Sequence, residues 1–159
     1  MLVIKAVCLN SANMLLCLPP EFFRKEKADM MEPGKDSLDL GILVSDIKSS
    51  LNFYQNILGL KFVEQIPSGF GTMYRLRFGN SDFKLIDPRS RPQRGPTGIE
   101  NQLGFRYVTF VVKNLSKLCT EIQSKGIEFV VAEKEARPGV RIAMVNDPDG
   151  NIVEFVERS

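Results

Sequence analysis

Hydrophobic and polar positions alternate along several short stretches of the chain, and the first alternation gives way to a helical spacing. Leu40, Ile42 and Val44 recur with a period of two, which is typical of a β-strand buried on one face. Apolar residues then recur every three or four positions over residues 47–58 and stop at Gly59. Glycine accepts the left-handed backbone that ends many helices, so the pattern predicts a strand followed by a helix.

The same pattern occurs a second time. Residues 39–63 match residues 107–130 in the order of strand, helix and strand. Asp46 and Asn114 stand at the two predicted helix starts, where a side-chain oxygen can accept a hydrogen bond from an unpaired backbone amide. Two copies of one unit indicate a duplicated fold.

Further alternating stretches separated by turn sequences complete each copy. The predicted strands after the helices span residues 60–65, 73–78, 83–86, 128–131, 139–145 and 152–156. The fold class is therefore predicted to be α+β, with two tandem βαβββ modules. Each module is expected to form a four-stranded mixed sheet with a helix on one face, and the two free faces are expected to form a shared groove.

The repeat also sets the predicted domain limits. Residues 1–37 do not match it and are interpreted as an N-terminal extension and linker, or as sequence upstream of a true start at Met30 or Met31. Residues 38–157 form the predicted domain, divided into module one (38–87), a connector (88–103) and module two (104–157).

Composition narrows the function classes. The 159 residues are 43% hydrophobic and 25% charged with a net charge of +2, as in ordinary globular proteins, and no basic run indicates nucleic-acid binding. The apolar start is too short and broken to cross a membrane. Three cysteines lack metal or redox spacing, and Cys119 is predicted to be a buried thiol, which favours a reducing, cytoplasmic location.

The motifs in residues 44–47, 53–60 and 147–154, together with the duplication, resemble the vicinal oxygen chelate superfamily. This superfamily includes glyoxalase I, extradiol dioxygenases and the bleomycin-resistance proteins. The resemblance implies the two-module fold over about residues 38–157. It implies much less about the reaction, because one fold hosts many chemistries as well as plain binding.

Metal-dependent members hold a divalent ion with four side chains, and the resemblance implies that Asp39, Lys84, Tyr107 and Glu154 occupy these positions. Only Glu154 is the expected residue type, and the chain has no histidine. A protonated lysine has no lone pair to give to a metal. We therefore expect no cofactor and no bound metal, although these four residues could also be ordinary strand and surface residues.

Strand parity adds candidate cations. If Tyr74 and Leu76 face the helix, Arg77 faces the groove. In the same way, if Ile142 faces the helix, Arg141 faces the groove. Guanidinium groups pair well with carboxylates and phosphates. Arg77, Arg141, Lys84, Asp39, Tyr107 and Thr109 are therefore the predicted ligand-binding residues.

The sequence favours a small-molecule-binding protein of the glyoxalase or bleomycin-resistance type, with a polar or anionic organic ligand and no metal. Whether it is an enzyme stays open, and Glu154 is the candidate general base. Lys84 is predicted to replace the metal charge and to pair with Glu154 and Asp39. The alternative is a glyoxalase-like lyase or isomerase that recruits a divalent metal through Glu154 and Asp39. The groove can form within one chain or across a homodimer.

Overall fold

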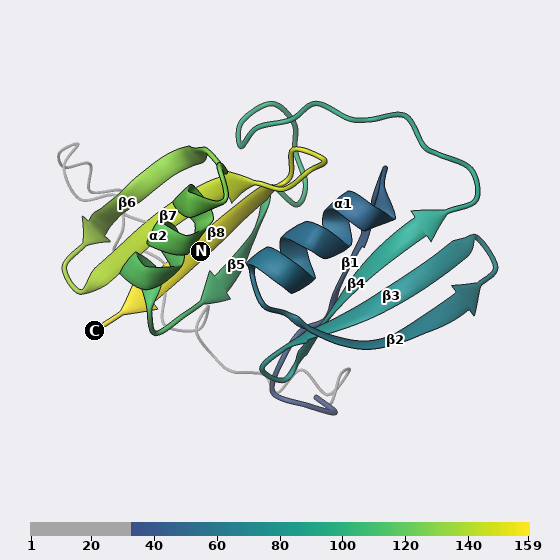
Figure 1. Cartoon of the computed structure of the whole chain (residues 1–159), viewed down its shortest axis with the longest axis horizontal. Coiled ribbons are helices and arrows are strands. Elements are labelled where there is room, and N and C mark those ends of the chain that lie inside the picture. The colour runs from purple at the N-terminus through teal and green to yellow at the C-terminus, as the bar shows by residue number, and fades with distance from the viewer. Residues whose placement is uncertain (1–32) are drawn as a thin grey trace, which may run out of the picture. The chain divides into compact units, whose positions relative to one another are not determined.

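The computed structural model describes residues 33–159, and the predicted extension before residue 33, with Met30 and Met31, lies outside these residues. The described part contains two four-stranded mixed sheets, each with a helix (Figure 1). The predicted α+β class and the two tandem modules are confirmed. The exact limits of the linker and connector stay predictions.

The first module begins at one edge of its sheet and ends in the strand beside that edge. Its elements are β1 (Leu40–Leu43), α1 (Ile47–Leu51), η2 (Asn52–Ile57), β2 (Lys61–Ser68), β3 (Gly71–Phe78) and β4 (Ser81–Pro88). The strand order is β1-β4-β3-β2, and β1 pairs in parallel with β4. The helical segment therefore carries the chain from one edge strand to the other, and two hairpins bring it back.

The second module repeats this plan. Its elements are β5 (Tyr107–Val111), α2 (Leu115–Ser124), β6 (Phe129–Arg137), β7 (Val140–Asn146) and β8 (Ile152–Arg158). The strand order is β5-β8-β7-β6, with β5 parallel to β8. The connector runs from the end of β4 to the start of β5 (Figure 1).

The two helix starts differ. The Asp46 carboxylate accepts a hydrogen bond of 2.9 Å from the Lys48 amide, which confirms the predicted cap. The predicted cap at Asn114 is wrong, because its side chain makes no capping hydrogen bond. The Leu115 amide instead donates to Glu157 of β8 at 3.4 Å. A tertiary contact thus replaces the local one.

The first helix changes its hydrogen-bond pattern after one turn. In η2 the Leu58 amide donates to the Phe53 carbonyl five residues earlier, at 2.9 Å, which is the π-helical pattern. Both Phe53 and Tyr54 are buried in this segment. The helix ends before Gly59, whose φ of 79° is the predicted left-handed conformation.

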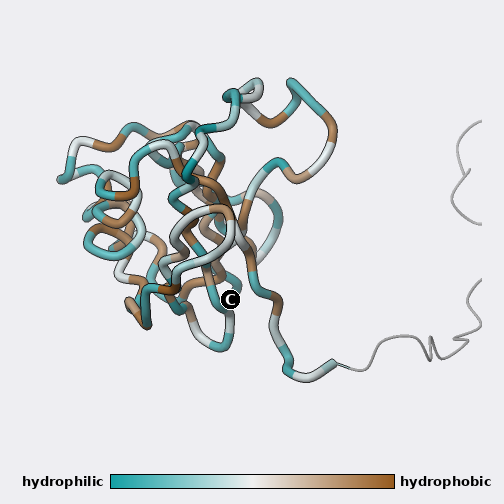
Figure 2. Tube along the Cα trace, turned by 90° about the vertical axis from the view of Figure 1, so that its right-hand side faces the viewer, coloured by the Kyte–Doolittle hydropathy of each residue, from teal (hydrophilic) through white to brown (hydrophobic). Residues whose placement is uncertain are grey.

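Aromatic rings join the cores of the two modules. Tyr54 of η2 packs on Phe83 of β4 with ring centroids 4.6 Å apart. Phe83 contacts Phe110 of β5 at 5.8 Å, and Phe110 stacks on Phe155 of β8 at 6.3 Å. The helix-facing sides of both sheets therefore share one hydrophobic cluster. Hydrophobic and hydrophilic residues alternate at short intervals along the chain (Figure 2).

Cys119 lies in this cluster as a buried free thiol, as predicted. Burial, with the nearby Glu133 carboxylate, raises the pKa of the thiol to about 11, so it stays protonated and unreactive at neutral pH. No helix in residues 33–159 is long and apolar enough to span a membrane.

Candidate functional site

We call the side of each sheet that points away from its helix the free face. In the first module it carries Arg75, Arg77, Asp82 and Lys84, because the residues between them on β3 and β4 point into the core. In the second module it carries Thr109, Ile142, Met144, Glu154 and Val156 by the same criterion. The first free face is thus largely charged and the second largely apolar.

Asp39, immediately before β1, is a centre of hydrogen bonds on the first free face. One carboxylate oxygen accepts from the Asp82 amide at 2.8 Å, and the other accepts from the Lys84 ammonium at 3.4 Å. Lys35 forms a further ion pair with the same carboxylate. The Lys35 hydrogen bond, followed by those of Asp82 and Lys84, holds the pKa of Asp39 well below its usual range. Asp39 is therefore an anion with its partners already in place.

Arg77 lies on the free face, where strand parity predicts it, but a carboxylate neutralises it. Its Nε and Nη2 atoms donate to one oxygen of Asp82 at 2.9 and 2.7 Å. Arg75 donates to the other oxygen at 3.3 Å and pairs with Glu64 as well. Asp82 stands opposite Arg77 in the β3–β4 register, and the Arg77 pairing lowers the pKa of Asp82.

Asp82 was not among the site residues predicted from the sequence. The available signal was the spacing from Arg77, since a two-residue turn at Gly79 and Asn80 places Asp82 opposite that arginine. Arg75 belongs to the same cluster.

Thr109 and Glu154 form the equivalent pair in the second module. They are direct neighbours in the β5–β8 register, and the Thr109 hydroxyl donates to Glu154 at 2.5 Å. Tyr107, two residues before Thr109, is 52% exposed on the same strand. A carboxylate and a phenol hydroxyl are therefore both accessible on this face.

The structure joins the predicted site residues in two separate pairs. Lys84 pairs with Asp39 within the first module, and Glu154 bonds to Thr109 within the second. The predicted pairing of Lys84 with Glu154 is wrong, since no ion pair joins them anywhere in the described chain. Asp39 is nearer because it leads into the strand beside β4, so the sheet itself brings the two side chains together.

The prediction that Arg141 faces the groove is also wrong. Ala143 and Val145 belong to the helix-side core, so Arg141 shares their side of β7. Its guanidinium donates to Ser116 of α2 at 2.7 Å. It also pairs with Glu133 at 2.6 Å and Glu157 at 3.1 Å. Both faces of β7 carry apolar side chains, so alternation alone could not determine which face points toward the helix.

The four residues at the family's metal positions do not fit a divalent ion. Lys84 offers an ammonium without a lone pair, and Asp39 is occupied by Lys35, Lys84 and a backbone amide. In the part of the chain that the structure describes, no three histidine, cysteine, aspartate or glutamate side chains lie together as a metal-binding group. The donor set thus lacks the several neutral or anionic ligands that such an ion requires.

A pocket that sequence reasoning missed lies at the connector. Its volume is about 290 Å³, and none of the predicted ligand-binding residues lines it. Arg91, Arg94 and Arg106 line it instead, together with Leu43 of β1 and Ile152 of β8. The sequence signal was the arginine- and proline-rich composition of the connector, which carries no periodicity to indicate a pocket.

Comparison with known proteins gives a consistent result. Residues 38–155 match the family described as Glyoxalase/Bleomycin resistance protein/Dioxygenase superfamily. A lactoylglutathione lyase of Pseudomonas aeruginosa is 26% identical over 141 residues, which cover 73% of this chain and 78% of the relative. A lactoylglutathione lyase of Neisseria meningitidis is 26% identical over 119 residues, covering 72% and 85%.

Solved structures share the fold at lower sequence identity. A glyoxalase family protein from Enterococcus faecalis has a TM-score of 0.64 and 21% identity, and the match covers 78% of this chain and 98% of that one. TnmS3, an antibiotic binding protein from a Streptomyces species, has a TM-score of 0.62 and 20% identity, covering 80% and 100%. The same architecture thus occurs in a protein described by what it binds.

Proposed function

The chain belongs to the Glyoxalase/Bleomycin resistance protein/Dioxygenase superfamily, and we propose that it binds a small polar or anionic organic ligand at its free faces without the metal that other members use. The observation that carries this proposal is the hydrogen bond of 3.4 Å between the Lys84 ammonium and the Asp39 carboxylate. At two positions where the family places metal ligands, this chain has an internal ion pair.

The physical reason is charge compensation. Carboxylates that are partly removed from water need a cation, which a metal ion or a basic side chain can supply. Lys84 supplies it for Asp39, and Arg77 supplies it for Asp82. An ammonium donates hydrogen bonds but cannot polarise a substrate as a divalent ion does.

The remaining groups fit a ligand with hydrogen-bonding functions and an apolar part. Glu154 offers an acceptor beside Thr109, and Tyr107 offers an exposed hydroxyl. Ile142 supplies half-buried apolar surface on the same free face, where Met144 and Val156 are buried. If the bound ligand undergoes proton transfer, Glu154 is the base that we would assign.

The test begins with metal analysis of the purified protein by mass spectrometry. We expect zinc, nickel, iron and manganese well below one ion per chain, and a melting temperature that a chelator leaves unchanged. A screen of small polar and anionic compounds then seeks a ligand, which should stabilise the fold by about 2.7 kcal/mol at a hundredfold excess over its Kd.

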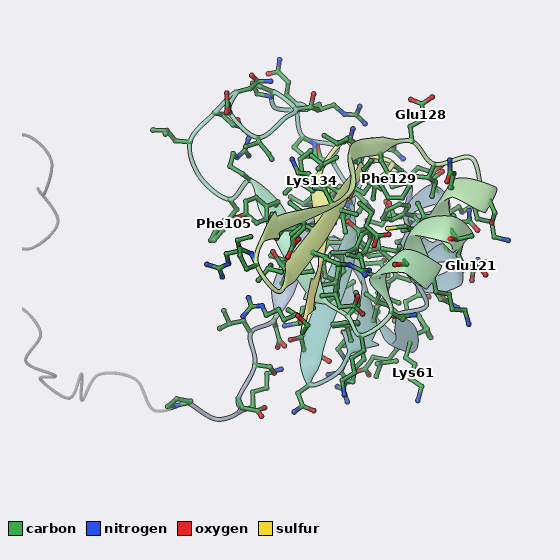
Figure 3. The ribbon with its side chains drawn as sticks, turned by 90° about the vertical axis from the view of Figure 1, so that its left-hand side faces the viewer. Lys61, Phe105, Glu121, Glu128, Phe129 and Lys134 are labelled. Carbon is green, nitrogen blue, oxygen red and sulfur yellow. The ribbon has the colours of Figure 1, made fainter. Side chains whose placement is uncertain are left out.

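Thr109→Val and Lys84→Met should each reduce this stabilisation. Lys61→Met is the matched control, because Lys61 is exposed at the start of β2 (Figure 3) and forms no ion pair within the described residues. One metal ion per chain, with a melting temperature that falls in chelator, would overturn the proposal.

A second candidate is a metal-dependent lyase that uses Asp39 and Glu154 with water. The similarity to relatives named lactoylglutathione lyase favours it. An assay with lactoylglutathione, before and after the addition of divalent metals, separates the two candidates. Metal-dependent turnover that Glu154→Gln abolishes would support the lyase. Cytoplasmic location and homodimer formation stay predictions.

A further inference from the structure

The connector forms a pocket where β1 ends and β8 begins. One wall consists of Leu43 at the end of β1 and Ile152 at the start of β8. The turn before β8 supplies Asp149 and Gly150, and residues 91–106 of the connector close the other sides. The pocket therefore has one apolar wall and one wall rich in arginine.

The arginine-rich wall has a surplus of positive charge. Three arginines line the pocket, and Asp149 is its one carboxylate, so the formal charge is three minus one, or +2. The Asp149 oxygens are both engaged, one with Arg94 at 2.9 Å and the other with the Ser45 amide at 3.0 Å. Asp149 is thus unavailable to compensate the remaining arginines.

Arg91 and Arg106 form no ion pair within the described residues. Arg106 donates to the carbonyl of Gly98 at 3.3 Å and to that of Phe105 at 2.6 Å, and these acceptors are neutral. Its side chain is held in place, but its charge is not balanced. Arg91 forms no hydrogen bond or ion pair within residues 33–159, and the anion nearby is Asp46, whose pKa Arg91 helps to lower. A guanidinium that forms no ion pair, in a concave surface, favours a bound carboxylate or phosphate.

The pocket walls are packed against each other. Gly150 has a φ of 82°, and a Cβ atom there would lie 2.8 Å from the Thr97 methyl group. The connector therefore lies against the turn at a distance that only glycine allows. Phe105 projects from the connector on the side of the sheets opposite α2 (Figure 3) and is 96% exposed. Its ring can cover the apolar part of a bound molecule.

We propose that this connector pocket binds a small organic anion, with its carboxylate or phosphate group at Arg91 and Arg106 and its apolar part against Leu43, Ile152 and Phe105. The cations of the first free face are already paired with Asp39, Asp82 and Glu64, whereas in the pocket only Arg94 has an ion-pair partner within the described residues. The proposal does not depend on a ligand at the free faces or on the absence of a metal.

The experiment is a two-dimensional NMR titration of the full chain at low ionic strength with phenyl phosphate, and with benzyl alcohol as the neutral analogue. We expect shifts of the Ser45, Gly98 and Gly150 amides with phenyl phosphate and much weaker binding of benzyl alcohol. Arg91→Gln and Arg106→Gln should each weaken phenyl phosphate binding by about tenfold, the loss of one charged hydrogen bond.

Arg89→Gln is the matched control, because Arg89 belongs to the same segment but does not line the pocket. It should weaken binding much less than the pocket variants do, because it removes the same charge without removing a contact in the pocket. An intact, dispersed spectrum establishes that each variant is folded. Equal binding of the two probes, no loss in Arg91→Gln, or shifts only around Lys84 would overturn the proposal. The last outcome would still support ligand binding at the free faces, so the two proposals can fail separately.

Discussion

The hydroxyl of Tyr54 donates a hydrogen bond of 2.8 Å to the carboxylate of Asp147, and this bond joins the helix of the first module to the turn before β8 of the second. Both residues are buried. Asp147 also accepts from the amides of Asn151 and Asp149 at 2.8 and 2.9 Å. The turn is thereby fixed by its own aspartate, and the same aspartate anchors it to the other module.

Removal of the Tyr54 hydroxyl tests this junction. Tyr54→Phe leaves a buried carboxylate short of one partner, so we expect the free energy of unfolding to fall by about 1–3 kcal/mol in urea titrations. Tyr107→Phe is the control, because its ring is 52% exposed and hydroxyl loss there should have almost no effect. A loss in Tyr54→Phe no larger than in the control would contradict the role of the junction.

The buried Tyr54 hydroxyl should also make the fold less stable at alkaline pH. Burial, reinforced by Asp147, raises the pKa of Tyr54 far above its ordinary value of 10.0. Above about pH 10 the unfolded chain loses this proton while the folded chain keeps it, so stability should fall as pH rises. Urea titrations from pH 8 to pH 11 should show a steeper decline in the wild type than in Tyr54→Phe. Equal slopes would contradict the assignment.

The fold could be predicted because duplication and periodicity agree. The alternation in β3 gave the correct faces, since Leu76 and Phe78 are apolar and Arg77 lies between them. The same reasoning failed in β7, where Ala143 and Met144 are both buried although they point to opposite faces. The spacing of apolar residues did not predict the π-helical turn after Leu51.

The candidate site could be predicted only in part. Sequence matching located Asp39, Lys84 and Glu154, but strand neighbours decide which of them meet. The connector pocket depends on how irregular backbone folds over Ile152, and no periodic pattern encodes that.

The ion pair of Asp39 and Lys84 predicts that the stability of the fold decreases at acidic pH. The Lys35 hydrogen bond, with those of Asp82 and Lys84, depresses the pKa of Asp39 from the ordinary 3.8. Its stabilisation is therefore present above about pH 4 and is lost as pH falls, because the unfolded chain then binds a proton first. Asp39→Asn should be less stable than the wild type at pH 7, and the difference should shrink below pH 4.

A double-mutant cycle identifies the partner of Lys84. Lys84→Met and Asp39→Asn should be coupled, whereas Lys84→Met and Glu154→Gln should be additive, because only the first pair is in contact. The measurement is chemical denaturation at pH 7 and low salt. Coupling of Lys84 with Glu154 alone would restore the pairing predicted from the sequence and contradict the arrangement described above.

We expect Arg141 to stabilise the fold rather than to bind the ligand. It holds Ser116, Glu133 and Glu157 together beside α2, but its side chain is 42% exposed, so its ion pairs are partly screened. Arg141→Gln should lower stability by about 0.5–1 kcal/mol and leave ligand affinity unchanged. Arg137→Gln, an exposed position on β6 without an ion pair in residues 33–159, should change neither. Lost affinity with full stability would place Arg141 on the free face after all.

Gly150 allows a separate test of how the connector is held. Alanine at Gly150 would meet two costs, a left-handed backbone with φ of 82° and a Cβ atom 2.8 Å from the Thr97 methyl group. Gly59→Ala is the matched control, because its φ is 79° but no atom lies within 4 Å of the added carbon. Both variants should lose about 1–2 kcal/mol to the backbone conformation. Only Gly150→Ala should also release the connector, seen as faster amide hydrogen exchange over residues 91–106. If the two variants show the same stability and the same exchange, the contact between Thr97 and Gly150 does not hold the connector in place.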